Sequence, residues 1–386
     1  MNCWARLVVV LFLFSFSLRA QSPSVAIALE QQGKLDEAAQ VWRDVTKRSP
    51  RDAAAFASLG VVLSKQQKYK DAASAYRKAL SLNPKLPGIR INLGLAEFKQ
   101  GNFKQAILPL QAAVRAEPQN QQARTLLGFS YYGAGIFAEA SRELTPLAAA
   151  DPSNTELHYT LAQSCLWAKQ HDCATREFRN LLENNPDSAA VHMLMAQALD
   201  GTGKTDEAIA EFQAAARVSP REPNVHFGLG FLYWKSQQYD EAQREFEAEL
   251  ANDPNHAQAL TYLGDIELKQ NKAAGAIEFL EKATRIRSDV RLAYLDLGAA
   301  LQQQKRYAEA LKALQRAVDL DPEQPDTHYR LGRLYEALGR SADAQRELAR
   351  TRELRQRADQ ADEDLVRKMS TRPAPLPEAE GGKRQP

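Results

Sequence analysis

Few side chains in this sequence are of types that could carry out chemistry. Cys165 and Cys173 are the only cysteines after residue 20, and seven residues separate them. A pair at this spacing could form a disulfide or remain as two buried, unreactive thiols. His158, His192 and His226 recur at intervals of 34 residues, and imidazole rings gathered around one point could bind zinc.

The histidine series does not predict a metal site. Equivalent positions on packed helices lie about 8–10 Å apart, whereas zinc needs its nitrogen ligands about 2 Å away. A half-buried ring between helices fits the pattern better. The sequence also lacks an HExxH motif, a paired-cysteine zinc motif and a glycine-rich phosphate loop. We therefore predict no metal, no cofactor and no enzymatic activity.

A fixed spacing of 34 residues organises the chain that must position these side chains. Proline follows it, with Ser288 as the one interruption, at Pro50, Pro84, Pro118, Pro152, Pro186, Pro220, Pro254 and Pro322. Alanine keeps the same interval from Ala38 to Ala344. Glycine keeps it from Gly60 to Gly332, with Ala162 and Ala196 in two of the places. A period of this length predicts a solenoid of stacked units.

Each unit predicts two helices joined by a short turn. In residues 53–86, Phe56, Leu59 and Leu63 recur at helical spacing, and a second such set follows from Tyr69. Two short amphipathic helices of this kind form an antiparallel hairpin. Asn83 and Pro84 then end the second helix, because proline disfavours helical backbone in the residue before it.

These landmarks resemble the tetratricopeptide repeat. That family places a large residue at repeat position 4, Leu at 7, Gly or Ala at 8, Ala at 20 and 27, and Pro at 32. Residues 293–322 match it with Tyr294, Leu297, Gly298, Leu301, Ala310, Leu314, Ala317 and Pro322. The resemblance covers residues 24 to about 356. It implies an all-α, right-handed superhelical solenoid of ten 34-residue helix–turn–helix repeats.

The sequence predicts four segments. Residues 1–20, with Arg6 followed by an apolar run and a small residue at Ala20, read as a cleaved signal peptide. Residues 21–356 form the solenoid, with repeats ending near 50, 84, 118, 152, 186, 220, 254, 288, 322 and 356. Residues 357–370 are expected to be a capping helix over the last apolar face. Residues 371–386 are expected to be disordered.

The signal peptide predicts a periplasmic or secreted protein, and a bacterial one. In an exported chain, Cys165 and Cys173 favour a disulfide, because they flank the turn of one hairpin and face each other. This pairing is also similar to hairpin-clamping disulfides in secreted relatives of the repeat. The net charge of +2 gives no basic field for a nucleic acid, and no apolar run after cleavage could span a membrane.

The resemblance implies that the first helix of each repeat lines a concave groove, through positions 2, 5, 9, 12 and 13. In the third to seventh repeats, the residues that we expect to bind a partner there are mostly apolar or aromatic: Ile91, Leu95, Phe98, Phe129, Tyr132, Tyr159, Gln163, Trp167, Gln197, Phe227, Phe231 and Trp234. Contiguous exposed rings mark binding surfaces. The alternative is that these rings turn inward and form core.

This pattern predicts a non-enzymatic scaffold for protein–protein interaction in the bacterial cell envelope. It would hold an extended peptide or a partner helix against the aromatic groove. The alternative is a glycan-handling module in the export or assembly of an envelope polysaccharide, since the same rings could stack on sugar faces.

Overall fold

The computed structural model describes residues 22–370, and these residues form helices and short connections with no strand among them. The all-α solenoid of helix–turn–helix repeats is therefore confirmed. The predicted signal peptide and C-terminal tail lie outside the described residues and stay predictions. Within residues 22–370, no helix combines the length and the apolarity that crossing a membrane requires.

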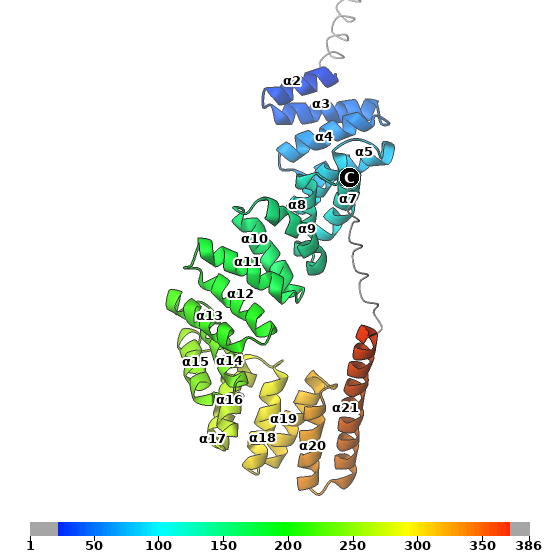
Figure 1. Cartoon of the computed structure of the whole chain (residues 1–386). Helices are drawn as coiled ribbons and strands as arrows, with labels where there is room; N and C mark the ends of the chain where they lie inside the picture. The colour runs from blue at the N-terminus through cyan, green and yellow to red at the C-terminus, as the bar shows by residue number, and fades with distance from the viewer. Residues whose placement is uncertain (1–21, 371–386) are drawn as a thin grey trace, which may run out of the picture. The chain divides into compact units, whose positions relative to one another are not determined.

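The described residues divide into two compact units, 22–211 and 212–370, and each unit is described by itself (Figure 1). The first unit contains α2 (Pro23–Gln31), α3 (Leu35–Arg48), α4 (Ala53–Lys65), α5 (Tyr69–Leu82), α6 (Ile89–Lys99), α7 (Phe103–Ala116), α8 (Gln121–Gly133), α9 (Phe137–Ala150), α10 (Thr155–Trp167), α11 (His171–Asn184) and α12 (Ala189–Gly201). Helix α13 (Thr205–Val218) includes the division. The second unit contains α14 (Val225–Lys235), α15 (Tyr239–Asn252), α16 (Ala257–Lys269), α17 (Ala273–Ile286), α18 (Arg291–Gln303), α19 (Tyr307–Leu320), α20 (Pro325–Ala337) and α21 (Ser341–Ser370).

Even-numbered helices are the first helices of the repeats, and odd-numbered helices are the second. The second helices α3, α5, α7, α9, α11, α15, α17 and α19 each pack on the first helix of their own repeat and on the first helix of the next repeat. First helices also contact one another directly, as α6 and α8 do in the first unit and α16, α18 and α20 do in the second. The first helices α4 to α12 in the first unit and α14 to α20 in the second therefore each form a layer, whose outer face can display side chains.

Close contact between the two helices of a repeat depends on the glycine at position 8. A Cβ atom added to Gly298 would lie 2.5 Å from Cγ of Leu314, and one added to Gly60 would lie 2.4 Å from the Tyr76 ring. The alanine at position 20 lies opposite and is almost fully buried, as in Ala310. The periodic small residues thus set the spacing of the helices that carry the surface.

The first helices α6 and α14 are two residues shorter at their N-termini than α4 or α16. In both repeats a proline, Pro87 or Pro223, is followed by a residue with left-handed backbone: Gly88 at φ 70° or Asn224 at φ 66°. Asn224 provides no side-chain cap for α14. Glu249 does so instead, because its buried carboxylate accepts hydrogen bonds from the backbone N–H groups of Asn224 (3.1 Å) and Phe227 (3.0 Å).

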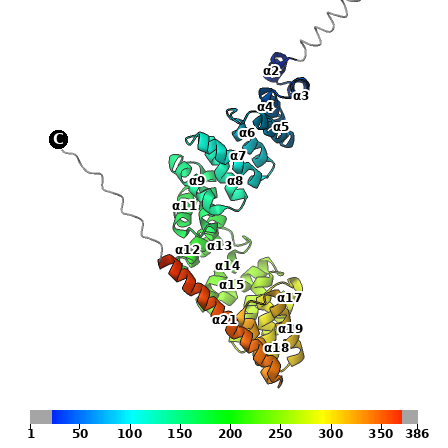
Figure 2. The same ribbon diagram turned by 90° about the vertical axis from the view of Figure 1, so that its right-hand side faces the viewer.

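The segment predicted as a capping helix falls within a longer helix. Residues 357–370 are the continuation of α21, which runs unbroken from Ser341 (Figure 2). Leu354 is buried, but residues 355–364 are all exposed. Among the residues of α21 whose burial is described, Ala344, Thr351 and Leu354 are the buried ones, so the earlier half of the helix covers the last apolar face.

Candidate functional site

In the first unit, the predicted binding residues lie on four first helices. They are Ile91, Leu95 and Phe98 on α6, Phe129 and Tyr132 on α8, Tyr159, Gln163 and Trp167 on α10, and Gln197 on α12. Trp167 is 53% exposed. The Tyr132 hydroxyl donates a hydrogen bond to Oε1 of Gln163, which joins two predicted residues from adjacent repeats. Phe137, which the sequence did not single out, contacts the rings of both Tyr132 and Trp167.

Ile91 does not lie where the sequence predicted. It is buried and packs with Ala113 and Ala123 in a small core cluster. The side of Ile91 that remains open borders a pocket of about 210 Å³ between the start of α6 and the end of α7. The remaining predicted residues of the first unit are half-buried or exposed, so the alternative of a fully internal aromatic stripe does not describe them.

In the second unit, four rings gather on the first helices α14 and α16. We call Phe227, Phe231, Trp234 and Tyr262 the ring cluster. The Trp234 and Tyr262 centroids are 4.9 Å apart, those of Phe231 and Tyr262 are 5.6 Å apart, and Phe231 stacks on Trp234 at 6.0 Å. All four rings are half-buried. Phe227, Trp234 and Tyr262 pack against the core cluster around Phe246, and Phe231 contacts Trp234 and Tyr262.

Polar atoms border the ring cluster on α16. The Trp234 indole N–H donates to Oδ2 of Asp265 at 2.6 Å, and the Lys269 ammonium lies 3.4 Å from Oδ1 of the same carboxylate. Asp296 of the next first helix is 3% exposed. Burial and the nearby charge of Asp265 raise the pKa of Asp296 to about 7, partly offset by Arg330, Lys269 and Arg291. Burial and the same two aspartates raise the pKa of Tyr262 as well.

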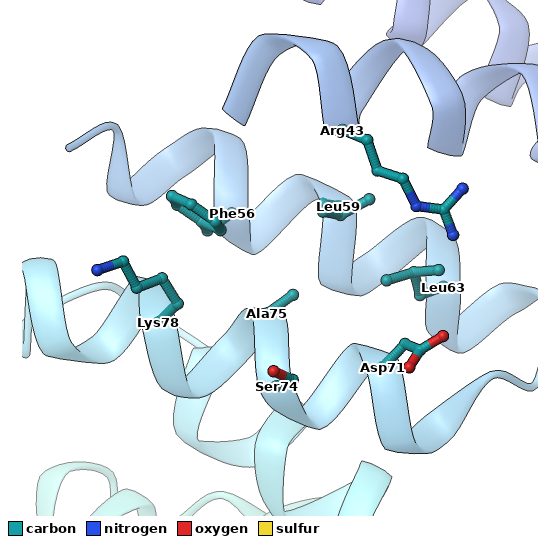
Figure 3. A pocket seen from close by; sticks show the side chains of 8 residues that line it. All are labelled: Arg43, Phe56, Leu59, Leu63, Asp71, Ser74, Ala75 and Lys78. Carbon is teal, nitrogen blue, oxygen red and sulfur yellow. The ribbon is translucent and has the colours of Figure 1, made fainter. Parts of the chain in front are cut away.

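Each unit also contains a larger hollow. In the second unit, a pocket of about 410 Å³ between α18 and α20 is lined by polar and charged residues that include Gln302, Gln303, Tyr329, Arg330 and Arg333. In the first unit, a pocket of about 430 Å³ lies among α3, α4 and α5. Figure 3 shows its apolar floor, with the charged groups of Arg43 and Asp71 at one end and Lys78 at the other.

Comparison with known proteins identifies the repeats. Profiles described as "Tetratricopeptide repeat" match residues 26–87 and 227–291, and residues 63–128 and 131–198. A third profile, described as "TPR repeat", matches residues 202–237 and 300–339. Together these matches cover most of residues 26–339. This chain is a tetratricopeptide repeat protein.

Several solved structures are similar to this chain. The structure titled "Crystal structure of APC/C hetero-tetramer Cut9-Hcn1" is 14% identical, covers 85% of this chain and 79% of that one, and gives a TM-score of 0.50. MamA from Desulfovibrio magneticus RS-1 is 26% identical over 44% of this chain and 97% of its own, with a TM-score of 0.40. YrrB, titled "a TPR protein with an unusual peptide-binding site", is 21% identical, with coverages of 46% and 91% and a TM-score of 0.39. No curated relative matches the chain.

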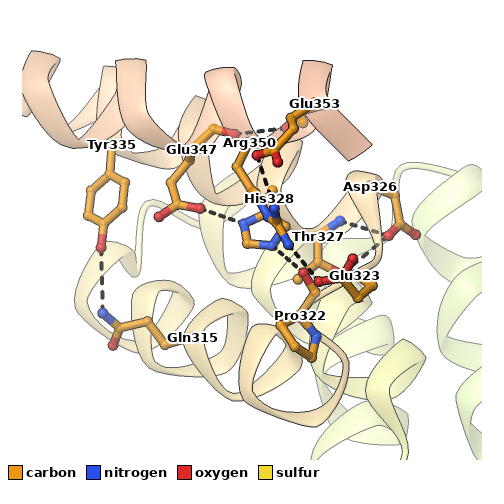
Figure 4. Close-up of polar contacts among 11 residues, drawn as sticks. Gln315, Pro322, Glu323, Asp326, Thr327, His328, Tyr335, Glu347, Arg350 and Glu353 are labelled. Atoms are coloured by element: carbon orange, nitrogen blue, oxygen red, sulfur yellow. Dashed lines mark hydrogen bonds and ion pairs between the residues drawn. The ribbon is translucent and has the colours of Figure 1, made fainter. Parts of the chain in front are cut away.

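Histidine at repeat position 4 has a structural role in this tetratricopeptide protein. Four such rings each contact a glutamate 19 residues later through Nδ1, in the pairs His158–Glu177, His192–Glu211, His226–Glu245 and His328–Glu347. Nε2 of His328 also faces the carbonyl oxygen of Pro322 at 2.9 Å (Figure 4). Each ring therefore ties the two helices of its own repeat together, and three of them also hold the preceding turn.

The structure pairs Cys165 of α10 with Cys173 of α11 in a disulfide across the hairpin turn, with their Cα atoms 5.8 Å apart. The sequence predicted this pair because the two cysteines flank the turn of one hairpin.

The sequence did not reveal Tyr262, Asp265 and Asp296 as parts of the second-unit surface. Asp265 occupies position 9 of the eighth repeat, beyond the third to seventh repeats to which the binding residues were assigned, and Tyr262 and Asp296 occupy position 6, which is not among the groove positions. The available signal was a carboxylate at position 6 or 9 of a helix whose neighbouring positions are apolar. Such a residue needs partners from the adjacent repeats.

Proposed function

We propose that this protein is a non-enzymatic interaction scaffold, which binds an extended peptide or a partner helix on the first-helix face of its second unit. Tetratricopeptide repeats mediate protein–protein interaction and are generally non-catalytic. The observation that carries the proposal is the ring cluster. Half-exposed Phe and Trp side chains on a rigid layer of helices provide large apolar contact at a low entropic cost.

The residues of the first unit support a second contact region on the same kind of face. Trp167 is exposed, and the Tyr132–Gln163 hydrogen bond fixes a polar pair beside it. We propose that apolar contact dominates the affinity, and that amide groups such as Gln163 and Gln197 orient the partner.

We further propose that the mature protein acts in the bacterial cell envelope after signal peptide cleavage near Ala20. The N-terminal apolar run and the Cys165–Cys173 disulfide support this location, because disulfides persist in oxidising compartments. The test is mass spectrometry of the protein purified from its native envelope. The mature chain is expected to begin near Gln21 and to be two protons lighter than its reduced form. An intact N-terminus with two free thiols would contradict the location.

The binding proposal is tested by capture from envelope extract, with wild type beside Phe231→Ala/Trp234→Ala. The matched control is Ile286→Ala, which removes an exposed apolar side chain from the second helix α17. The proposal is supported if wild type and the control capture the same partner and the double variant does not. The captured partner should also stay bound in 1 M salt.

A direct titration separates a peptide partner from a glycan. Peptides cut from the captured partner are expected to change the fluorescence of Trp234 in a saturable way, and envelope oligosaccharides are not. Saturation by oligosaccharides with no response to the peptides would overturn the peptide assignment.

A further inference from the structure

Beside the ring cluster lies a site built for a positive charge, and a lysine of the chain itself occupies it. The Lys269 ammonium lies 3.4 Å from Oδ1 of Asp265 and 5.9 Å from the ring centroids of both Trp234 and Tyr239. A carboxylate flanked by aromatic faces attracts cations both by charge and by the quadrupoles of the rings. The Trp234–Asp265 hydrogen bond holds the carboxylate and one of these rings in a fixed relation.

The two side chains of the Lys269–Asp265 pair differ in how far they are buried. The Asp265 side chain is 13% exposed, whereas that of Lys269 is 39% exposed and joined to the helix by a flexible chain. An exposed lysine gains little from such a pair, but a buried carboxylate needs a partner to offset the loss of water. Lys269 can therefore leave at little cost, provided that another cation takes its place.

Asp296 is a second buried carboxylate close enough to Asp265 to feel its charge. Its Oδ2 is buried and has no hydrogen-bond partner within residues 22–370. Three cations of this unit act on it, Arg330, Lys269 and Arg291. Arg291 already contacts Asp326 and Thr327, so its charge is shared. If Lys269 were to move away with nothing in its place, two neighbouring buried aspartates would lose a compensating charge.

We propose that the partner presents a basic side chain, arginine or lysine, which displaces Lys269 from Asp265 and packs against the exposed face of Trp234. The inference rests on the proposed function and specifies the chemistry of one partner residue. Arginine suits the site best, because its planar guanidinium can stack on indole while it donates to a carboxylate. Apolar residues on either side of the basic side chain would rest on Phe231 and Phe227.

The test uses two capped pentapeptides, acetyl-Ala-Leu-Arg-Leu-Ala-amide and the same peptide with citrulline, which keeps the shape of arginine but carries no charge. The readout is the NMR signal of the Trp234 indole N–H, which donates to Asp265 and is identified by its loss in Trp234→Phe. The arginine peptide is expected to shift this signal in a saturable way, and the citrulline peptide is expected to bind at least fivefold more weakly. Equal binding of the two peptides would overturn the proposal.

Lys269→Met provides the decisive variant, because removing the competing ammonium should strengthen arginine-peptide binding by about two- to fivefold. Lys272→Met is the matched control. It removes the same charge from a lysine that lies close by in the sequence and contacts Glu267 instead. A gain in both variants would indicate general charge repulsion, and weaker binding in Lys269→Met would show that Lys269 is part of the binding surface. Either result refutes displacement.

Failure of this inference and failure of the proposed function are distinguishable. If the citrulline peptide binds as well as the arginine peptide and Phe231→Ala, which keeps the Trp234 signal, abolishes both interactions, the peptide surface stands and only the cation site is lost. If neither peptide binds and envelope capture does not depend on the ring cluster, the proposed function itself fails.

Discussion

His328 and Glu347 show how one pair of residues can hold a repeat closed. The pair joins α20 to α21, and the ring also contacts the carbonyl oxygen of Pro322. Other repeats place different pairs at the same two positions: Phe56 with Ala75 and Tyr294 with Ala313. The hairpin therefore accepts either a polar pair or an aromatic ring over a small residue. Combining one residue from the polar pair with one from the aromatic pair would leave a partly buried carboxylate or imidazole without its hydrogen-bond partner.

This argument predicts strong coupling between the two residues. His328→Phe and Glu347→Ala are each expected to lower the free energy of unfolding by about 1–3 kcal/mol, because each leaves one polar group unsatisfied. The double variant, which copies the Phe56–Ala75 pair, should cost clearly less than the sum of the two. Urea unfolding of the four proteins measures the coupling energy. Simple additivity would show that the hydrogen bond contributes nothing.

Asp296 predicts a pH dependence of stability. Its folded pKa of about 7 lies above the ordinary value near 3.9, so the folded state binds the proton more tightly than the unfolded state. The contribution of this group is fully present below about pH 4 and is lost as the pH rises through about 7. Each pKa unit corresponds to about 1.4 kcal/mol. Asp296→Asn should therefore raise the unfolding free energy at pH 8 by roughly 2–4 kcal/mol and change it little at pH 4.

Asp289→Asn serves as the comparison for that measurement. Asp289 is an exposed aspartate whose pKa is lowered by its hydrogen bonds with Arg287, so its neutralisation should give no gain at pH 8. Chemical denaturation of wild type and both variants at pH 4, 6 and 8 would measure their unfolding free energies. A gain for Asp296→Asn that is the same at all three pH values would mean that the buried charge is not its cause.

At the scale of the element, α14 depends on a residue outside its own sequence. The N-cap residue Asn224 has left-handed backbone and makes no side-chain cap, so the first backbone N–H groups of the helix turn to Glu249 of α15. The family pattern expects alanine at the position of Glu249. The departure is explained by the shortened start of α14, and the same helix carries three of the four rings in the ring cluster.

Glu249→Gln should therefore destabilise the second unit. The amide has one acceptor oxygen in place of two charged ones, so we expect a loss of about 1–3 kcal/mol in unfolding free energy. Hydrogen exchange should quicken first at the start of α14. Glu247→Gln is the control, because Glu247 is an exposed residue of α15, the helix that carries Glu249, and this change should have little effect. If Glu249→Gln and Glu247→Gln lower the unfolding free energy equally, Glu249 does not cap α14.

At the scale of the whole molecule, the fold followed from the sequence because its signals are local and repeated. Gly298, Ala310 and Pro322 each act within one hairpin, and a pattern repeated ten times leaves little ambiguity. The binding surface was less predictable, since it depends on contacts between repeats. Tyr262 joins three rings of the preceding repeat, and Ile91 turns toward α7 and away from the expected face. Position within one repeat does not specify such contacts.

The end of the solenoid gives a last prediction. In a repeat array each unit is stabilised by its neighbours, so the final apolar face must be covered. Among the residues whose burial is described, Thr351 and Leu354 are the last buried side chains there. A chain that stops after Arg357 keeps both and should change the unfolding free energy by less than about 0.5 kcal/mol. A chain that stops after Leu348 loses both and should be destabilised by about 2 kcal/mol or more. Thermal and urea unfolding of the two truncated proteins beside the full chain would measure this. A large loss on removing residues 358–386 alone would instead assign the cap to the later part of α21, as the sequence first suggested.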